Sequence, residues 1–453
     1  MREPGAILLV ACYELGHQPL AVAWPAAFLE RAGYAPAVLD LSVEPFDAER
    51  VARARLVAIS VPMHTALRLG AGVAARVRAA NPRCHVAFYG LYASLNAGHL
   101  LAHGADSVLS GEVESALVDL AGRLEREPRA TARPRPILAK LDFPVPSRAG
   151  LPALKRYAHV EKGGRLELAG YVEASRGCKH LCRHCPIPPV YGGRFFVVPE
   201  AVVLADVRQQ VAAGATHVTF GDPDFLNGPG HALRVARALH AEFPSVTFDV
   251  TAKVEHLLRH RDRLPELARL GCIFAVTAAE SLSDTVLAHL AKGHTRADVV
   301  AALRAVRDAG IAPRPTWVPF TPWTTLDDYR ELLDFVEDEG LVDAIDPVQY
   351  SIRLLVPPGS LLLESPALAP HLGPLVADAF HHRWTHPDPR MDRLAGAVAA
   401  LVAEAADRRE DPAATFDRIW RLADETAGAP SRAAVAPRPE RERPPRLTEP
   451  WFC

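Results

Sequence analysis

Three cysteines within a short stretch, Cys178, Cys182 and Cys185, constrain this chain more than any other feature of its sequence. They have C-x3-C-x2-C spacing and follow an apolar run, 168–174, that predicts a buried strand. Thiolates are soft ligands that suit iron–sulfur clusters. Three thiolates can hold three irons of a four-iron cube and leave the fourth iron open, whereas an electron carrier normally supplies a fourth cysteine. The motif therefore predicts a [4Fe-4S] cluster with one open iron.

Zinc is the alternative ligand of these cysteines. Cys182 and Cys185 form a C-x2-C half-site, to which His180 or His184 could add a nitrogen. The sequence has no second C-x2-C pair, and the next cysteine, Cys272, lies in an apolar, strand-like run. This favours the cluster and leaves a non-catalytic iron–sulfur or zinc protein as the second interpretation.

Size and charge narrow the class of protein. The 453 residues suffice for two or three domains, and Lys+Arg 51 against Asp+Glu 53 gives a net charge of −2. That balance predicts no bulk attraction to nucleic acid or to an anionic membrane. No apolar run is long enough to span a bilayer, and the clustered cysteines suit a reducing compartment. We expect a cytoplasmic protein without a nucleic-acid or membrane partner.

The order of the predicted elements indicates an α/β protein with several parts. In residues 1–124, apolar runs at 7–11, 37–41, 56–61, 85–89 and 108–112 alternate with helical patterns at 19–31, 65–79 and 114–123. Such alternation predicts a Rossmann-like parallel sheet. Residues 125–165 are rich in proline and arginine and read as a linker along the surface.

Strands and helices alternate again from 166 to 370. Strands are expected at 170–175, 217–221, 247–251, 273–278, 314–318 and 347–354, with helices between them. Residues 371–424 predict a helical segment. Residues 425–453 form a polar tail rich in proline and arginine that cannot bury itself and that ends in Cys453.

The cysteine motif, placed just after the first strand of the second unit, resembles the radical S-adenosylmethionine (SAM) superfamily. The resemblance implies a partial (β/α)6 barrel and SAM bound to the open iron through its amine and carboxylate. It also implies an external one-electron reductant of flavodoxin or ferredoxin type. The residue before the third cysteine is usually aromatic in that family. Here it is His184, which would cover the cluster or the adenine.

The same resemblance implies contacts between SAM and the ends of the barrel strands, where active sites of parallel barrels gather. Gly221, Asp222 and Asp224 match a turn that receives the SAM ammonium, although an ordinary Asp-Pro turn is the alternative. Glu280 matches a glutamate that contacts the SAM ribose or carboxylate, with a helix-capping role as the alternative. Arg353 would donate two parallel hydrogen bonds to the SAM carboxylate, and a surface salt bridge is the alternative role.

Residues 104–114, at the end of the first unit, resemble the end of cobalamin-binding domains that are fused to radical SAM barrels. Many such domains carry Asp-x-His-x-x-Gly after the first strand, and its histidine ligates cobalt. Here the stretch 12–18 reads Cys-Tyr-Glu-Leu-Gly-His-Gln, and the spacing does not match. Cobalamin is therefore a candidate cofactor without the support of a cobalt-ligand motif, and a degenerate domain kept for packing or for shaping the substrate site is the alternative.

The tail resembles a radical SAM group whose chains end in Cys-Cys-Ala-Glu-Pro or Cys-selenocysteine-Ala-Glu-Pro. The resemblance implies that the natural chain continues past Cys453 with selenocysteine. It also implies that Cys453 is a catalytic residue whose thiol binds a soft atom of the substrate. We thus expect a radical SAM enzyme that cleaves SAM at its cluster to modify a small molecule, with a soft heteroatom as one target. Cobalamin-dependent methyl transfer is the alternative reaction.

Overall fold

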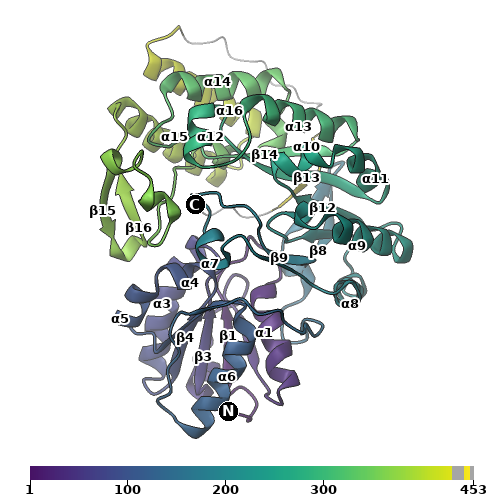
Figure 1. Ribbon diagram of the computed structural model, residues 1–453, viewed down its shortest axis with the longest axis vertical. Coiled ribbons are helices and arrows are strands. Elements are labelled where there is room, and N and C mark those ends of the chain that lie inside the picture. The colour runs from purple at the N-terminus through teal and green to yellow at the C-terminus, as the bar shows by residue number, and fades with distance from the viewer. Residues whose placement is uncertain (431–442, 449–453) are drawn as a thin grey trace.

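The computed structural model describes residues 1–430 and 443–448. Figure 1 shows an N-terminal sheet unit at one end of the molecule and a larger barrel-like unit at the other. A hairpin on one flank, β15 (Leu372–Val376) and β16 (His381–Trp384), reaches toward the N-terminal unit. The predicted fold class, a Rossmann-like sheet followed by a partial barrel, is confirmed.

The N-terminal sheet has the order β2-β1-β3-β4-β5-β6, and all its neighbouring strands pair in parallel. Its strands are β1 (Ile7–Ala11), β2 (Ala37–Asp40), β3 (Leu56–Ser60), β4 (His85–Tyr89), β5 (Ser107–Gly111) and β6 (Pro136–Ile137). Chain order reverses between β1 and β3. In open parallel sheets, ligands bind beyond the carboxyl ends of the strands at such a reversal.

Helices cover both faces of this sheet because its strands are apolar on both sides. The helices are α1 (Leu20–Arg31), α2 (Ala48–Arg53), α3 (His64–Ala80), α4 (Leu91–Leu95), α5 (Ala97–Ala102) and α6 (Val113–Arg126). In β1, Ile7 and Leu9 share a core with α1 and α6, whereas Leu8 and Val10 share one with α2 and α3. The two cores fix the sheet between its helices.

The linker predicted at 125–165 is more tightly held than its composition suggests. It contributes β6, a 3₁₀ turn at Leu154–Arg156 and strand β7 (His159–Lys162). The Arg148 guanidinium is buried between the two units, where it donates to both Asp206 oxygens at 2.6 and 2.8 Å and to the Tyr171 carbonyl at 2.6 Å. The segment is thereby fastened to the first barrel helix.

The barrel sheet has the order β14-β13-β12-β11-β8-β7-β17. Five strands run parallel: β8 (Arg165–Val172), β11 (His217–Phe220), β12 (Thr247–Thr251), β13 (Cys272–Glu280) and β14 (Ala312–Trp317). The helices of the barrel are α8 (Glu200–Ala212), α9 (Pro229–Glu242), α10 (Val254–Arg259), α11 (Leu264–Arg269), α12 (Asp284–His289), α13 (Arg296–Asp308) and α14 (Leu326–Asp338). Thr295 and Thr325 each start a helix with a capping box.

The prediction of a sixth strand at 347–354 is wrong. Pro347–Tyr350 form a 3₁₀ helix, and only a single bridge joins Arg353 to Phe320. The side chain of Gln349 accepts a hydrogen bond from the Trp317 backbone N–H at 3.0 Å. A side chain thus satisfies a donor of β14 that a sixth strand would otherwise have used.

The C-terminal part differs from the predicted all-helical segment. The β15–β16 hairpin comes first and is followed by α15 (Pro389–Asp407) and α16 (Pro412–Ala427). Phe380, at the hairpin turn, is 3% exposed and packs in the core of the N-terminal unit. Within the tail, β17 (Arg446–Leu447) pairs with β7. Among the described residues, no helix combines the length and apolarity that crossing a bilayer requires.

We expect Arg148→Ala to lower stability by about 3–5 kcal/mol, because it leaves the Asp206 carboxylate buried without its partner. Arg208 is a matched control. It makes the same two-bond contact to Glu242, at 2.6 and 2.8 Å, but its side chain is 53% exposed. Arg208→Ala should change stability far less, because solvent screens an exposed ion pair. Urea unfolding midpoints measure both, and equal midpoints would show that the buried linker contact does not stabilise the fold.

Candidate active site

The cysteine loop begins where the first barrel strand ends. After β8 the chain forms β9 (Ser175–Gly177), which pairs with β10 (Phe195–Val197), and Cys178 follows directly. Gly177 has φ +73°, and a Cβ atom there would lie 2.5 Å from the Arg194 carbonyl oxygen. Only glycine fits this close approach of the two strands. The turn therefore fixes the direction in which the cysteines leave the barrel.

The three cysteines share one partly buried region. The Cys185 N–H donates to the Cys182 carbonyl at 3.2 Å, and Cys182 is 7% exposed. Burial, and then the negative charges that Cys182 and Cys178 would carry, raise the pKa of Cys185 to about 12. Burial also raises the pKa of Cys178. Thiolates here need a cationic centre to stabilise them, and a set of three thiolates is the donor chemistry that suits iron–sulfur clusters.

The arrangement of donors does not favour zinc. Tetrahedral ligands at about 2.3 Å from one ion lie within about 4 Å of one another. Among the residues that the structure describes, the only three His, Cys, Asp or Glu ligand atoms within 4.8 Å of one another belong to His180, Asp224 and His256. No such group includes any of the three cysteines. The thiolates of a four-iron cube bind different irons and stand farther apart.

Protein contacts hold the His180–Asp224–His256 group together, although His180 Nε2 is buried without a hydrogen-bond partner among the described residues. His256 Nδ1 contacts Asp224 Oδ2 at 2.6 Å, and His180 Nε2 lies 3.5 Å from the same oxygen. The Lys253 ammonium is 3.0 Å from His180 Nδ1, which can only accept from it. His180 then carries its proton on Nε2, facing Asp224, where a metal ligand would need a free lone pair. The group ties the cysteine loop to α10.

Glu280 and His184, both predicted to contact SAM or the cluster, lie against each other. His184 Nε2 and Lys292 Nζ each lie 3.2 Å from Glu280 Oε1. Burial favours the neutral acid, but the Lys292 ammonium and His184 hold the pKa of Glu280 well below its usual range. Glu280 also has φ +66°, a left-handed conformation that costs a non-glycine residue free energy. The predicted contacts with SAM remain predictions.

The turn after β11 holds the next three predicted residues. Asp222 accepts from the Ala174 N–H at 2.9 Å and from the Ser175 hydroxyl at 2.5 Å, and burial raises its pKa to about 7. Asp224 accepts from the Leu226 N–H at 3.1 Å. A Cβ atom at Gly221 would lie 2.4 Å from the Tyr171 ring. The two carboxylates are therefore used in fixing the loop, and a backbone contact with SAM stays a prediction.

The last two predicted site residues lie elsewhere. The Arg353 guanidinium pairs with Asp392 at 2.8 Å, donates to the Trp384 carbonyl at 2.8 Å and stacks over the Trp384 ring at 3.6 Å. This is the salt bridge that the sequence left open as the alternative to a SAM contact. Cys453 falls outside the described residues, and its role in soft-atom chemistry stays a prediction.

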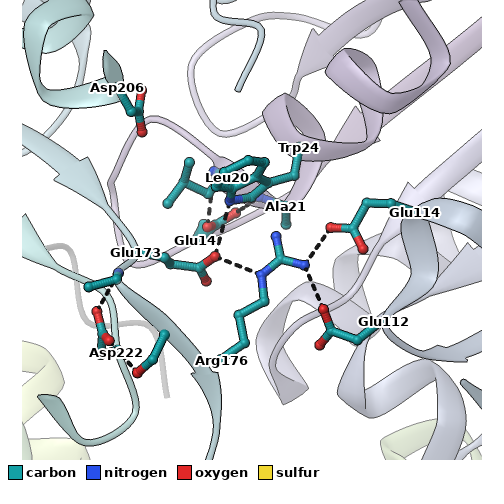
Figure 2. A network of polar contacts seen from close by, with 12 residues as sticks. Glu14, Leu20, Ala21, Trp24, Glu112, Glu114, Glu173, Arg176, Asp206 and Asp222 are labelled. Atoms are coloured by element: carbon teal, nitrogen blue, oxygen red, sulfur yellow. Dashed lines mark hydrogen bonds and ion pairs between the residues drawn. The ribbon is translucent and has the colours of Figure 1, made fainter. Parts of the chain in front are cut away.

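A buried ion network, which the sequence did not single out, joins the cysteine loop to the N-terminal sheet (Figure 2). Arg176 reaches Glu114 at 2.6 Å and Glu112 at 3.3 Å, both just past β5, and Glu173 at 3.0 Å. Tyr191 donates to the other Glu112 oxygen at 2.8 Å. The two closely spaced glutamates after a strand and an arginine beside the cysteine motif were the available signal, but only folding brings them together.

A cavity of about 240 Å³, open at its mouth, lies between this network and the carboxyl ends of β1, β3, β4 and β5. Its wall combines Glu14, Trp24, Ser60, Met63, Tyr89, Gly90 and Glu114 of the first unit with Tyr171, Glu173, Arg176, Ile187, Tyr191 and Pro223 of the second. Burial, followed by the nearby Glu173 charge, raises the pKa of Glu14 to about 8. Glu114 Oε2 has no hydrogen-bond partner among the described residues. The cavity is thus rich in acceptors and is adjacent to the cysteine loop.

Two family models match this chain. Residues 172–336 match the model described as the radical SAM superfamily, and residues 6–121 match the B12 binding domain. Among curated proteins, a tRNA-2-methylthio-N(6)-dimethylallyladenosine synthase of Geobacter sulfurreducens is 29% identical over 211 residues, which are 43% of this chain and 45% of the relative. An anaerobic magnesium-protoporphyrin IX monomethyl ester cyclase of Synechocystis is 23% identical over 262 residues, 54% of this chain and 49% of that one. The chain spans about half the length of these relatives.

Two solved structures share most of this architecture. The cobalamin-dependent SAM radical enzyme OxsB, with aqua-cobalamin and SAM bound, matches with a TM-score of 0.67 and 14% identity over 88% of this chain and 67% of that one. The radical SAM methyltransferase TsrM of Kitasatospora setae matches with a TM-score of 0.57 and 19% identity, over 74% of this chain and 71% of that one. At these identities the likeness is one of fold. The radical SAM match implies a [4Fe-4S] cluster and SAM as cofactors, and the chain contains a B12-binding domain, matched over residues 6–121, and a radical SAM domain, matched over residues 172–336.

Proposed function

We propose that this protein is a cobalamin-dependent radical SAM enzyme that transfers a methyl group to a small-molecule substrate. The observation that carries the proposal is the cavity between the two domains, because it begins at the carboxyl edge of the B12-type sheet and ends at the turn before Cys178. A corrinoid in this cavity and a cluster at the cysteines would lie on either side of Arg176 and Gly177.

The lining of the cavity suits a corrinoid by its chemistry. The cavity, about 240 Å³, lies below the range of about 300–1000 Å³ for ligand pockets, but it is open at its mouth, so a corrinoid bound there would extend beyond it. A corrin ring carries amide side chains whose N–H groups donate, and Glu114 Oε2, which has no hydrogen-bond partner among the described residues, offers an acceptor. No histidine is among the lining residues, so cobalt would receive no imidazole from this wall. This agrees with the missing cobalt-ligand motif after the first strand.

The residues of the chain bind and orient the reacting groups. When bound, the cluster supplies the electron that cleaves the SAM sulfonium, and the corrinoid supplies a methyl carrier. Cys178, Cys182 and Cys185 would hold the cluster, and Lys292 places a buried positive charge near the last two of them. Arg176 fixes the loop against the B12-type sheet. A ligand that filled the cavity would displace water from its aromatic wall, which would strengthen electrostatic contacts inside it.

A cluster-dependent enzyme without cobalamin is the second candidate, and the chain's relatives do not separate the two. The Geobacter relative is named as an enzyme that acts on tRNA, but the chain covers less than half of that protein. The small-molecule substrate is therefore part of the proposal. Cobalt and iron contents of the anaerobically reconstituted protein, measured with SAM-derived products, distinguish the candidates.

We expect Cys182→Ala to remove the cluster, because two thiolates cannot replace three at a cube. The variant should lose the iron, the visible absorption of the cluster, and all SAM cleavage under dithionite. Cys272→Ala is the matched control, because this thiol is buried in β13 and should keep full iron content. Iron retained by the Cys182 variant, or zinc alone in the wild type, would contradict the proposal.

We expect Ala21→Trp to block cobalamin and leave the cluster intact. Ala21 lines the cavity at the start of α1, so an indole there would occupy the space proposed for the corrin. Cobalt binding should fall at least about tenfold, a loss of about 1.4 kcal/mol, with iron content and cluster spectrum unchanged. Ala400→Trp, on the exposed face of α15, is the control and should bind cobalt as the wild type does.

Equal cobalt binding by both variants would place the corrinoid elsewhere. Absence of cobalt from the wild type, with SAM cleavage retained, would support the cluster-only candidate instead.

A further inference from the structure

The segment that carries the cysteines is basic, although the whole chain is slightly acidic. From residue 174 to residue 199 it contains Arg176, Lys179, Arg183 and Arg194 and no aspartate or glutamate, whereas the net charge of the chain is −2. Arg176 is neutralised by the buried glutamates. The other three cations lie at exposed positions.

These cations surround the cysteine loop. Lys179 and Arg183 flank an exposed leucine, Leu181, which is 56% exposed and directly precedes the buried Cys182. Gly193 lies against the loop, since a Cβ atom there would lie 3.4 Å from Leu181 Cδ2 and 3.5 Å from the Lys179 carbonyl oxygen, and the exposed Arg194 is the next residue. We call Lys179, Leu181, Arg183 and Arg194 the loop surface.

The positive charge of the loop surface is not neutralised within the described chain. The side chains of Arg183 and Arg194 make no ion pair or hydrogen bond with any described residue. The Lys179 ammonium donates to the Asn227 carbonyl at 2.8 Å and stacks over the Phe195 ring at 4.6 Å, contacts that leave its charge in place. An exposed leucine rimmed by free cations resembles an interface, where apolar contact at the centre is combined with polar groups at the rim.

We propose that the loop surface is the docking site for an acidic one-electron carrier protein. This inference rests on the proposed function, since SAM cleavage at the cluster consumes one electron that the chain's own residues do not supply. The carrier is oxidised by one electron, and the electron enters beside Cys182, which adjoins both Leu181 and Arg183. Negative charge on the carrier complements the three cations and would accelerate its encounter with the loop.

An RNA partner fits the loop surface less well. RNA-binding surfaces combine a track of cations along the phosphates with aromatic side chains that stack on bases. Here the exposed apolar side chain is the aliphatic Leu181, and the nearby Phe195 ring is already covered by Lys179. RNA binding at these residues is therefore an outcome that would overturn the proposal.

The test uses the full chain, reconstituted anaerobically, and the triple variant Lys179→Glu, Arg183→Glu, Arg194→Glu. Cluster reduction is followed by stopped flow with photoreduced flavodoxin, an acidic carrier, at low and high salt. The wild-type rate should fall as salt rises, and the triple variant should react at least about tenfold more slowly at low salt, with little dependence on salt. Photoreduced deazaflavin, a small neutral reductant, should reduce the cluster equally in both proteins.

A second triple variant controls for the change in net charge. Arg126→Glu, Arg133→Glu and Arg135→Glu reverse three exposed arginines beside α6 and β6, away from the cysteine loop, and should keep the wild-type rate. If the loop variant loses iron, the milder double variant Arg183→Ala, Arg194→Ala replaces it. This variant should still lower the rate of cluster reduction by flavodoxin severalfold.

Three results would overturn the docking site: an unchanged flavodoxin rate in the loop variant, an equal loss in the control variant, or binding of bulk tRNA that the loop substitutions abolish. A wild-type protein that accepts electrons from deazaflavin but cleaves no SAM would contradict the proposed function alone. In that case the flavodoxin rates still decide whether the loop surface is where the carrier docks.

Discussion

The buried guanidinium of Arg176 joins the two domains. Its side chain is 12% exposed and contacts carboxylates of Glu112, Glu114 and Glu173, the first two from the B12-binding domain. Taking an ion out of water costs several kcal/mol, which only close and well-directed partners offset. Each partner therefore depends on the others, and the contact forms only when both domains are folded. Because Arg176 is two residues from Cys178, the same contact fixes the cluster loop against the sheet.

Carboxylates outnumber cations at this interface, and this excess determines which ligands suit the cavity. Glu14, Glu112, Glu114 and Glu173 face one arginine. Burial raises the pKa of Glu14, of Glu112 and of Glu173 despite the Arg176 charge, so part of the excess negative charge is relieved by protonation. A ligand that brings hydrogen-bond donors would relieve it equally well. An amide-bearing ligand thus suits this wall better than an anion does.

Local patterns predicted the parts of the fold that local physics determines. The alternation of apolar runs and helical periods located the strands of both sheets, since each buries its own side chains against its own helices. The sixth barrel strand failed because Val348 to Leu354 has a strand-like composition, yet Pro347 starts a 3₁₀ turn and Gln349 takes the hydrogen bond of the neighbouring edge. Strand β17 was missed because two residues pair with a strand nearly three hundred positions earlier. No local pattern encodes such a contact.

The site shows the same division between local and long-range information. The cysteines were found because their spacing within one loop is itself the chemical signal. Glu280 and His184 were also found, but their contact with each other and with Lys292 was not, since the three residues come from different segments. The left-handed backbone of Glu280 costs on the order of 1 kcal/mol, and the ion pair with Lys292 offsets that strain. In return Glu280 keeps the buried lysine charged beside Cys182 and Cys185, because its carboxylate raises the pKa of Lys292 against the opposing effect of burial. A residue predicted as a cofactor contact therefore also sets the electrostatics of the loop that would hold the cluster.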